Sequence, residues 1–223
     1  MSSEQETSNR RTGRPPLTER RKAATRMDIA REAVRLFTSK GVAETSADEI
    51  AEAAGLSIRT LWRYCPGPGK ESFIRPLLTN GIDDVARALA DWAPGEALPD
   101  QLSGHAGADE NADVDTMLAL VRLTKEEPEI RTVWLQAHRD AEPAFAAGIA
   151  HRTGRRADEL SVKTEAAMVN TALRVAVEHT AEHSPAPEQA GTVLRAALRE
   201  VLPTISRDAP DHAAGNALPG ALA

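Results

Sequence analysis

The chain has 223 residues and a mass of 23.9 kDa, which suits one compact domain or two small ones. Alanine is abundant and aromatic residues make up only 3%, so the composition predicts an all-α fold. No apolar run approaches the ~18 residues of a membrane span, and no secretory signal opens the sequence. The single cysteine, Cys65, excludes an internal disulfide, and we therefore expect a cytoplasmic protein without membrane contact.

The charge is divided unevenly along the chain. Residues 1–75 hold 14 basic and 10 acidic side chains, whereas residues 76–223 hold 13 basic and 23 acidic ones. Within residues 10–40 alone there are ten basic and three acidic side chains. A basic end on an acidic body is typical of a protein that meets a polyanion at one end, although a solvated basic tail has the same pattern.

The first part of the chain is predicted to contain a disordered arm and a long helix. Residues 1–17 are polar and include Arg11 and Arg14 beside glycine and proline. Such a segment can lie in a DNA minor groove, and a solvated tail is the alternative. A helix is predicted from Thr18 to Ser39. Its apolar stripe repeats at helical spacing: Ile29, Ala33, Leu36 and Phe37.

Two short helices are predicted to follow. Ser46 and Glu49 form a capping box that opens a helix ending at Ala54. After a break at Gly55, Ser57 can cap a third helix that runs through residue 64. Two short helices joined by a three-residue break with glycine have the geometry of a helix-turn-helix. The alternative is an ordinary three-helix packing unit with a polar surface.

The rest of the chain is predicted to be helical, with about nine helices in all. A loop is expected at Pro66–Gly69 and another, with a short helix in it, over residues 94–110. Residues 206–223 are expected to form a flexible tail. The remaining helices are predicted over residues 70–93 with a kink at Pro76, 113–126, 128–153 with a bend at Pro143, 158–183 and 187–205.

Residues 26–64, RMDIAREAVRLFTSKGVAETSADEIAEAAGLSIRTLWRY, resemble the DNA-binding domain of TetR-family transcriptional regulators. The resemblance implies an all-α homodimer in which a helix-turn-helix domain, residues 18–70, binds a double-stranded DNA operator. It further implies that residues 71–205 bind a small effector and dimerise. Such regulators usually repress, and the effector releases them from DNA. Residues 127–150 and the next helix are loosely similar to the TetR subgroup that binds acyl-CoA-like ligands.

The DNA-contacting residues follow from the motif and from side-chain chemistry. Arginine can bond the O6 and N7 of guanine, while hydroxyls and helix-start amides can hold phosphates. The resemblance implies that Thr60 and Trp62 contact phosphates and that Lys70 contacts one at the start of the fourth helix. The loop before Lys70 is slightly longer than in the family. The predicted set is Arg11, Arg14, Thr45, Ser57, Arg59, Thr60, Trp62, Arg63, Tyr64 and Lys70.

The effector and dimer surfaces are predicted from polar groups and apolar stripes on the later helices. The candidate ligand residues could hold an amphipathic ligand with an anionic end, or belong to the core: Met117, Arg122, Trp134, His138, Asn170 and Arg174. The candidate dimer residues could close a four-helix bundle between two copies, or pack within their own domain: Val169, Leu173, Val177, Val193, Leu194, Ala197, Leu198 and Val201.

Two rival functions are a sequence-tolerant architectural DNA-binding protein and, less favoured, a small helical enzyme acting on a lipid-like substrate. No nucleophile motif supports catalysis. His179 and His183 share a helix face, but no third metal ligand is identifiable. Gly69-Lys70 is followed by Glu71, which does not fit a phosphate-binding loop. The sequence therefore predicts a regulator without catalytic, metal or cofactor sites.

Overall fold

A computed structural model of the chain describes residues 17–91, 108–183, 193 and 196–197. Within these ranges the secondary structure is entirely helical, which confirms the predicted all-α class. The helices are α1 (Leu17–Lys40), α2 (Ala47–Ala53), α3 (Ile58–Tyr64), the 3-10 helix η1 (Lys70–Ile74), α4 (Arg75–Asp91), α5 (Ala108–Leu123), α6 (Pro128–Thr153) and α7 (Leu160–His183).

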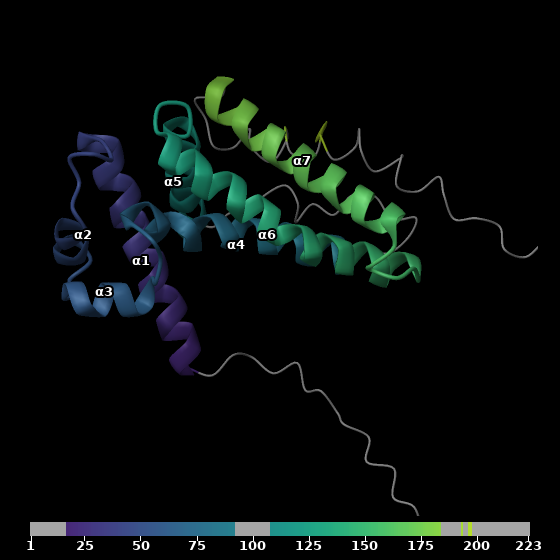
Figure 1. The fold of residues 1–223 in the computed structure, drawn as a ribbon, viewed down its shortest axis with the longest axis horizontal. Coiled ribbons are helices and arrows are strands. Elements are labelled where there is room, and N and C mark those ends of the chain that lie inside the picture. Colours follow the sequence, from purple (N-terminus) through teal and green to yellow (C-terminus); the bar gives the residue numbers. More distant parts are fainter. Residues whose placement is uncertain (1–16, 92–107, 184–192, 194–195, 198–223) are drawn as a thin grey trace, which may run out of the picture.

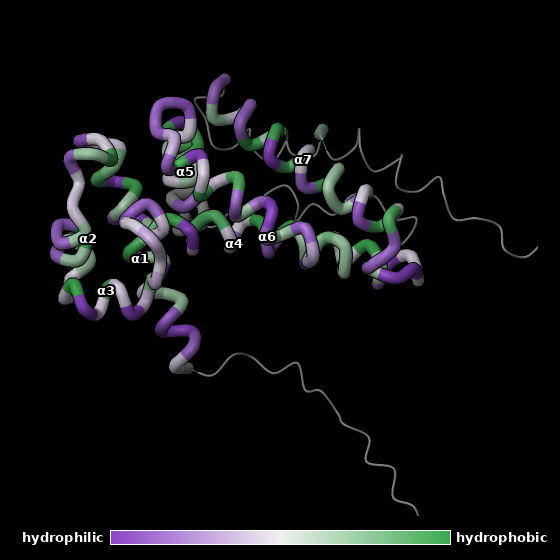
Figure 2. The backbone as a smooth tube through the Cα atoms, in the orientation of Figure 1, coloured by the Kyte–Doolittle hydropathy of each residue, from purple (hydrophilic) through white to green (hydrophobic). Residues whose placement is uncertain are grey.

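The three N-terminal helices gather at one end of the molecule, and α4 to α7 form an elongated bundle beside them (Figure 1). α1 begins with a hydrophilic stretch, purple in Figure 2, that contains Glu19, Arg20, Arg21 and Lys22. Further along, α1 packs against α2, α3, η1, α4 and α5. The long helix α1 therefore connects the two groups of helices.

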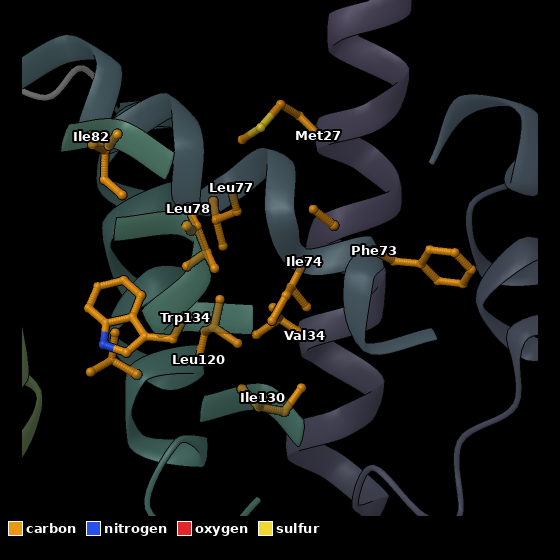
Figure 3. Close-up of a cluster of buried hydrophobic side chains, with 14 of the residues drawn as sticks. Met27, Val34, Phe73, Ile74, Leu77, Leu78, Ile82, Leu120, Ile130 and Trp134 are labelled. Carbon is orange, nitrogen blue, oxygen red and sulfur yellow. The ribbon is translucent and has the colours of Figure 1, made fainter. Parts of the chain in front are cut away.

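Buried hydrophobic side chains form one continuous cluster that joins both ends of the described structure. Figure 3 shows Val34 of α1 near Ile74 of η1, with Leu120 of α5 and Ile130 of α6 alongside. All four side chains are at most 2% exposed. Because removing apolar surface from water is the main favourable term in folding, this cluster holds the N-terminal helices against the bundle.

The segment after the Pro66–Gly69 loop differs from the single kinked helix that was expected. It forms the 3-10 helix η1 and then α4, with Pro76 as the second residue of α4. Proline has no N–H for a bond to the carbonyl four residues earlier, which is that of Ser72. The Arg75 N–H bonds this carbonyl instead, with 3-10 spacing. Pro76 therefore marks the start of the α-helix rather than a kink inside it.

Helix α6 lies between α4 and α7 and contacts both. It begins with Pro128, as predicted, continues through Pro143 to Thr153 and ends before Gly154, whose φ is +68°. At Gly148 it lies close to α4, since a Cβ there would touch the Ala86 carbonyl oxygen at 3.4 Å. The bundle thus places α6 and α7 side by side.

The expected count of about nine helices is not met within the described ranges, which hold seven α-helices and η1. The predicted short helix within 94–110 and the arm and tail lie outside the described residues, apart from the start of α5 at Ala108. Of the predicted helix over 187–205, only three residues are described: Val193, Ala196 and Ala197 are helical. No described helix combines the length and apolarity needed to cross a membrane.

Candidate nucleic-acid interface and binding clefts

Helix α2 begins with the predicted capping box. The Ser46 hydroxyl accepts from the Glu49 N–H at 3.2 Å, and the Ser46 N–H donates to the Glu49 carboxylate at 2.8 Å. Gly55 has a φ of +67°, which turns the chain so that the Leu56 N–H bonds the Ala51 carbonyl at 2.8 Å. These local bonds fix the start of α2 and the turn before α3.

Helix α3 is held by its own cap and by one buried side chain. The Ser57 hydroxyl accepts from the Thr60 N–H at 3.3 Å and lies 2.9 Å from the Thr60 hydroxyl. Leu61 is fully buried and packs in the core with Ile50 and Ala51 of α2. Two helices joined by a tight turn and pinned by a shared core form a helix-turn-helix.

The outer surface of α3 is basic. Arg59 and Arg63 are both exposed and lie four residues apart, so they share one face of the helix. The Arg63 guanidinium carbon is 5.5 Å from the centre of the Tyr64 ring. Arg59 has no hydrogen bond or ion pair with any described residue. An unpaired arginine on an exposed helix can form the two parallel bonds that guanine offers in the major groove.

Two aromatic residues of α3 are only partly available to a ligand. Trp62 is half-buried, and its ring packs edge-on against the Phe73 ring with 4.7 Å between centroids. Tyr64 is also half-buried, and its carbonyl accepts a bond from the Arg26 Nε of α1 at 3.0 Å. Figure 3 shows Phe73 pointing away from Ile74, so that η1 reaches both α3 and the central core. Trp62 therefore also anchors α3 to η1.

A cleft of about 360 Å³ opens between α5, α6 and α7. Four basic and two acidic side chains contribute to its wall. The Arg122 Nε donates to the Ala181 carbonyl at 2.7 Å, and Lys125 pairs with Glu182 at 2.9 Å. The full lining is Val121, Arg122, Thr124, Lys125, Arg131, Trp134, Arg174, Glu178, Ala181 and Glu182. We call it the basic cleft.

Glu178 joins the two helices that face each other across the basic cleft. Its carboxylate accepts from the Trp134 indole N–H at 2.9 Å and from Arg174 at 2.9 Å. Arg174 also lines a second cleft, of about 300 Å³, on the seam between α6 and α7. This histidine cleft is lined by Leu135, His138, Arg139, Glu142, Asn170, Thr171 and Arg174. The two clefts are therefore neighbours that share one arginine.

His138 and Asn170 form a buried pair in the histidine cleft. The His138 Nδ1 lies 2.7 Å from the Asn170 Oδ1, and the Asn170 Nδ2 donates to the His138 carbonyl at 2.8 Å. The rings of His138 and Trp134 pack edge-on with 4.2 Å between centroids. Burial lowers the pKa of His138 below its ordinary 6.5, and this loss of hydration outweighs the opposing hydrogen bond with Asn170. The ring is therefore neutral at pH 7.

Comparison with known proteins identifies the family from both parts of the chain. The model described as "Bacterial regulatory proteins, tetR family" matches residues 29–72, which contain the helix-turn-helix. The model described as "MftR C-terminal domain", of the same family, matches residues 93–206, about half of the chain. This chain belongs to the TetR family.

Individual relatives are more distant. The HTH-type transcriptional regulator TcmR of Streptomyces glaucescens is 28% identical over 150 residues, which span 63% of this chain and 65% of that protein. Among solved structures, GusR of Salmonella enterica is 21% identical with a TM-score of 0.48, covering 81% of this chain and 96% of that one. FadR of Thermus thermophilus, solved in complex with lauroyl-CoA, is 22% identical with a TM-score of 0.47, covering 88% and 100%.

Two residues that the TetR-family motif implies as DNA contacts have hydrogen-bond partners within the chain. Thr45 is only 1% exposed, and its hydroxyl donates to the Gly41 carbonyl at 2.8 Å, so this side chain does not reach DNA in the conformation described. The half-buried Lys70 donates to the Thr45 carbonyl at 2.6 Å and to the Ala43 carbonyl at 3.3 Å. Lys70 thus ties η1 to the turn between α1 and α2. Arg11 and Arg14 lie outside the described residues.

The predicted ligand residues divide between the clefts. Arg122 and Trp134 line the basic cleft, His138 and Asn170 line the histidine cleft, and Arg174 lines both. Met117 lines neither, because it faces α4, where its sulfur would be 3.7 Å from a Cβ at Gly81. Sequence reasoning missed Glu178 and Arg131. The only sequence signals were their helical spacings, four residues after Arg174 and three before Trp134.

The predicted dimer residues on α7 are largely covered within the chain itself. Val169 and Leu173 are 0% and 5% exposed within the chain's own core, and Val177 is half-buried against it. The apolar stripe of α7 therefore packs on its own domain. Val193 and Ala197 are helical and half-buried, whereas Leu194, Leu198 and Val201 lie outside the described residues. The large apolar side chains that remain exposed nearby are Leu135, Leu160, Met168 and Val175.

The capping box of α2 predicts a pH dependence of stability. The hydrogen bond from Lys40, followed by those from Ser46, lowers the pKa of Glu49 from 4.5 to about 2. A depressed carboxyl pKa contributes stability that is present above pH 4.5 and is lost as the pH falls towards 2. In Glu49→Gln the urea denaturation midpoint is therefore expected to depend less on pH between pH 4.5 and 2. Urea titrations at low salt measure this.

The exposed Asp48 provides the control for Glu49, because no hydrogen bond or ion pair links its carboxylate to a described residue. In Asp48→Asn the urea denaturation midpoint is expected to fall between pH 4.5 and 2 as steeply as in the parent. If the midpoint of Glu49→Gln falls as steeply as that of the parent, the capping carboxylate does not contribute to the acid sensitivity. Because Glu49 is exposed, the effect is also expected to shrink at high salt.

Proposed function

We propose that this protein is a dimeric transcriptional regulator that represses by binding a palindromic operator and is released by a small-molecule effector. The observation that carries the proposal is the exposed basic face of α3, where Arg59 and Arg63 stand four residues apart on a capped, core-anchored helix. The family match over residues 29–72 supports the same function. A DNA target of this kind implies a cytoplasmic protein.

DNA recognition is proposed to centre on the start and outer face of α3. Arg59 would bond a guanine, and Arg63 and the Ser57–Thr60 hydroxyl pair would hold phosphates. In a symmetric dimer the two α3 helices would enter successive major grooves about 34–36 Å apart. Trp62 and Tyr64 would contribute through their exposed edges, and Lys70 by fixing the α1–α2 turn rather than by a primary phosphate contact.

The dimer interface is proposed to use the outer face of α7. Met168 and Val175 are 38% and 50% exposed and lie seven residues apart, which places them on one side of the helix. Pairing of two such helices would remove both side chains from water. Val175→Glu is therefore expected to convert a dimer into a monomer, because it would bury a charge at a two-fold contact. Sedimentation velocity at micromolar protein measures the change.

A matched control for Val175→Glu comes from α6. Ala147 is exposed and lines neither cleft, so Ala147→Glu is expected to leave the sedimentation coefficient unchanged. A Val175→Glu variant that remains dimeric would place the interface elsewhere. Both variants should keep the helical circular dichroism of the parent, because both positions are solvent-exposed in the single chain.

Effector release is proposed to pass from the clefts to α3 through η1 and α4. The Arg75 guanidinium, at the start of α4, pairs with Asp140 of α6, the helix that contributes to both clefts. In η1, just before Arg75, Phe73 contacts Trp62 of α3, and Lys70 bonds the α1–α2 turn. A ligand that shifts α6 would therefore move Phe73, which supports α3, and Lys70, which supports the α1–α2 turn. Release requires that the ligand favour the spacing that does not fit DNA.

The function is tested by sequence-specific binding of the full-length protein. Duplexes selected from a random library are titrated by fluorescence anisotropy at fixed salt against scrambled duplexes of the same composition. The regulator is expected to bind selected sites at least about 10³-fold more tightly. Equal affinity for all duplexes would favour the architectural alternative. Absence of DNA binding together with turnover of a lipid-like substrate would favour the enzyme.

A further inference from the structure

The tautomer of His138 is determined by the orientation of Asn170. The Asn170 Nδ2 donates to the His138 carbonyl, which leaves the Asn170 Oδ1 facing the His138 Nδ1 at 2.7 Å. An amide oxygen only accepts hydrogen bonds. The Nδ1 of His138 must therefore carry the proton of the neutral ring, and Nε2 must carry the lone pair.

The Nε2 of His138 is buried and has no hydrogen-bond partner among the described residues. The whole side chain is only 4% exposed. Buried polar atoms are nearly always bonded, so an orphaned lone pair indicates a missing donor. A lone ring nitrogen does not make a metal site, and the described residues contain no group of three or more potential metal ligands.

The groups around His138 indicate what else a ligand of this site carries. Arg139 and Arg174 line the same cleft, together with Glu142. Arg174 pairs with Glu178 and continues into the basic cleft, where Arg131 is exposed. Neither Arg139 nor Arg131 has an ion pair with a described residue. The Trp134 ring, packed against His138, adds an apolar surface. The site therefore suits a ligand that has an anionic group beside the arginines and a hydrogen-bond donor at the His138 ring.

We propose that the α6–α7 clefts bind a small organic acid that bears a hydroxyl or amine, whose O–H or N–H donates to the Nε2 of His138. The inference rests on the proposed function only in treating this acid as the effector. Because Nε2 is enclosed, binding requires a small displacement of the groups around the ring. An acid with only acceptor groups at that end would leave the lone pair unsatisfied and would bind weakly.

The test uses four probes that differ at a single position: 4-hydroxyphenylacetate, 4-aminophenylacetate, 4-methoxyphenylacetate and phenylacetate. Binding to the full-length protein is measured by calorimetry at pH 8, where His138 is neutral. The hydroxyl and amine probes are expected to bind about tenfold more tightly than the methoxy probe. Equal affinities, as a permanently bound water at Nε2 would produce, overturn the proposal. So does the absence of binding by all four probes at millimolar concentration.

Two substitutions at His138 distinguish the contributions of its two ring nitrogens. In His138→Asn the amide can still donate towards Asn170, but nothing replaces the Nε2 lone pair, so the preference for donor probes is expected to disappear. In His138→Gln the longer amide places an oxygen near the Nε2 position, and the preference is expected to remain. His151→Gln is the control, because His151 is an exposed histidine of the same helix. Loss of the preference in His138→Gln, or its survival in His138→Asn, overturns the assignment.

The tautomer itself is tested independently of any ligand. Long-range ¹H–¹⁵N correlation spectra of histidine-labelled protein are expected to show an unprotonated Nε2 for the resonance that His138→Gln removes. A protonated Nε2 overturns the proposal even if a probe binds. Operator binding with no response to any probe would contradict this inference alone. A protein that shows the donor preference but binds no DNA would contradict the proposed function alone.

Discussion

Replacing Arg59 by alanine is expected to abolish base discrimination at one position of each half-site. A bidentate arginine–guanine contact contributes about 1–3 kcal/mol of discrimination, and a symmetric dimer makes the contact twice. The selected operator should therefore bind about 2–6 kcal/mol more weakly, whereas affinity for scrambled duplexes should fall only by the loss of one charge per protomer. Anisotropy titrations against the operator and its single-base variants at fixed salt measure both quantities.

Two further substitutions show whether the effect belongs to the base contact. Thr60→Ala is expected to weaken all sequences alike, because the Thr60 hydroxyl is assigned to phosphate, and Thr60→Ser should restore binding. Arg87 is an exposed arginine of α4, paired with Asp84, and Arg87→Ala should change neither affinity nor specificity. If the base preferences of Arg59→Ala match those of the parent, the recognition role of α3 must be reassigned.

The features that the sequence predicted correctly are those determined by neighbouring residues. The capping box of Ser46 and Glu49, the cap at Ser57 and the turn at Gly55 depend on atoms no more than a few positions apart. Such short-range patterns carry their own geometry. This is why the helix-turn-helix could be located from the sequence, and why the exposure of Arg59 followed from its place on α3.

Contacts between distant residues were not predictable in the same way. Trp134 and Glu178 are 44 residues apart, and nothing in the sequence pairs them, although their hydrogen bond shapes the basic cleft. Periodicity identified the apolar face of α7 but not its partner. Val169 and Leu173 therefore turned out to face the chain's own core rather than a second copy. A stripe shows only that a face is covered.

Thr45 illustrates a finer limit. The motif places Thr45 beside Ser46, and both residue types can cap a helix or hold a phosphate. Only the backbone decides which side chain faces outward: Ser46 caps α2 and stays exposed, while Thr45 turns inward and bonds Gly41. Adjacent polar residues at a helix start thus divide between a structural and a surface role. The sequence alone does not indicate which of the two residues takes which role.

Truncation of Phe73 is expected to weaken DNA binding through the position of α3. Phe73 is fully buried, so Phe73→Ala should lower the free energy of unfolding by about 3–5 kcal/mol. It also removes the ring against which Trp62 packs, a contact worth about 0.5–1.5 kcal/mol beyond burial. With that support gone, α3 loses the contact that orients it relative to η1. Operator affinity should therefore fall even at temperatures where the variant is fully folded.

Phe145 offers the matched comparison. It is also fully buried, but it lies in α6, whose main packing partners are α4 and α7, so Phe145→Ala should cost similar stability without a direct loss of operator affinity. Urea denaturation gives the stability of each variant, and anisotropy at 10 °C gives its affinity. Phe73→Leu keeps the site apolar and removes only the ring, so it serves if the alanine variant does not fold. Equal operator affinity in Phe73→Leu and the parent would show that α3 is oriented by Leu61 and the α2 core alone, and the proposed route from the clefts through η1 would then have to run through α1.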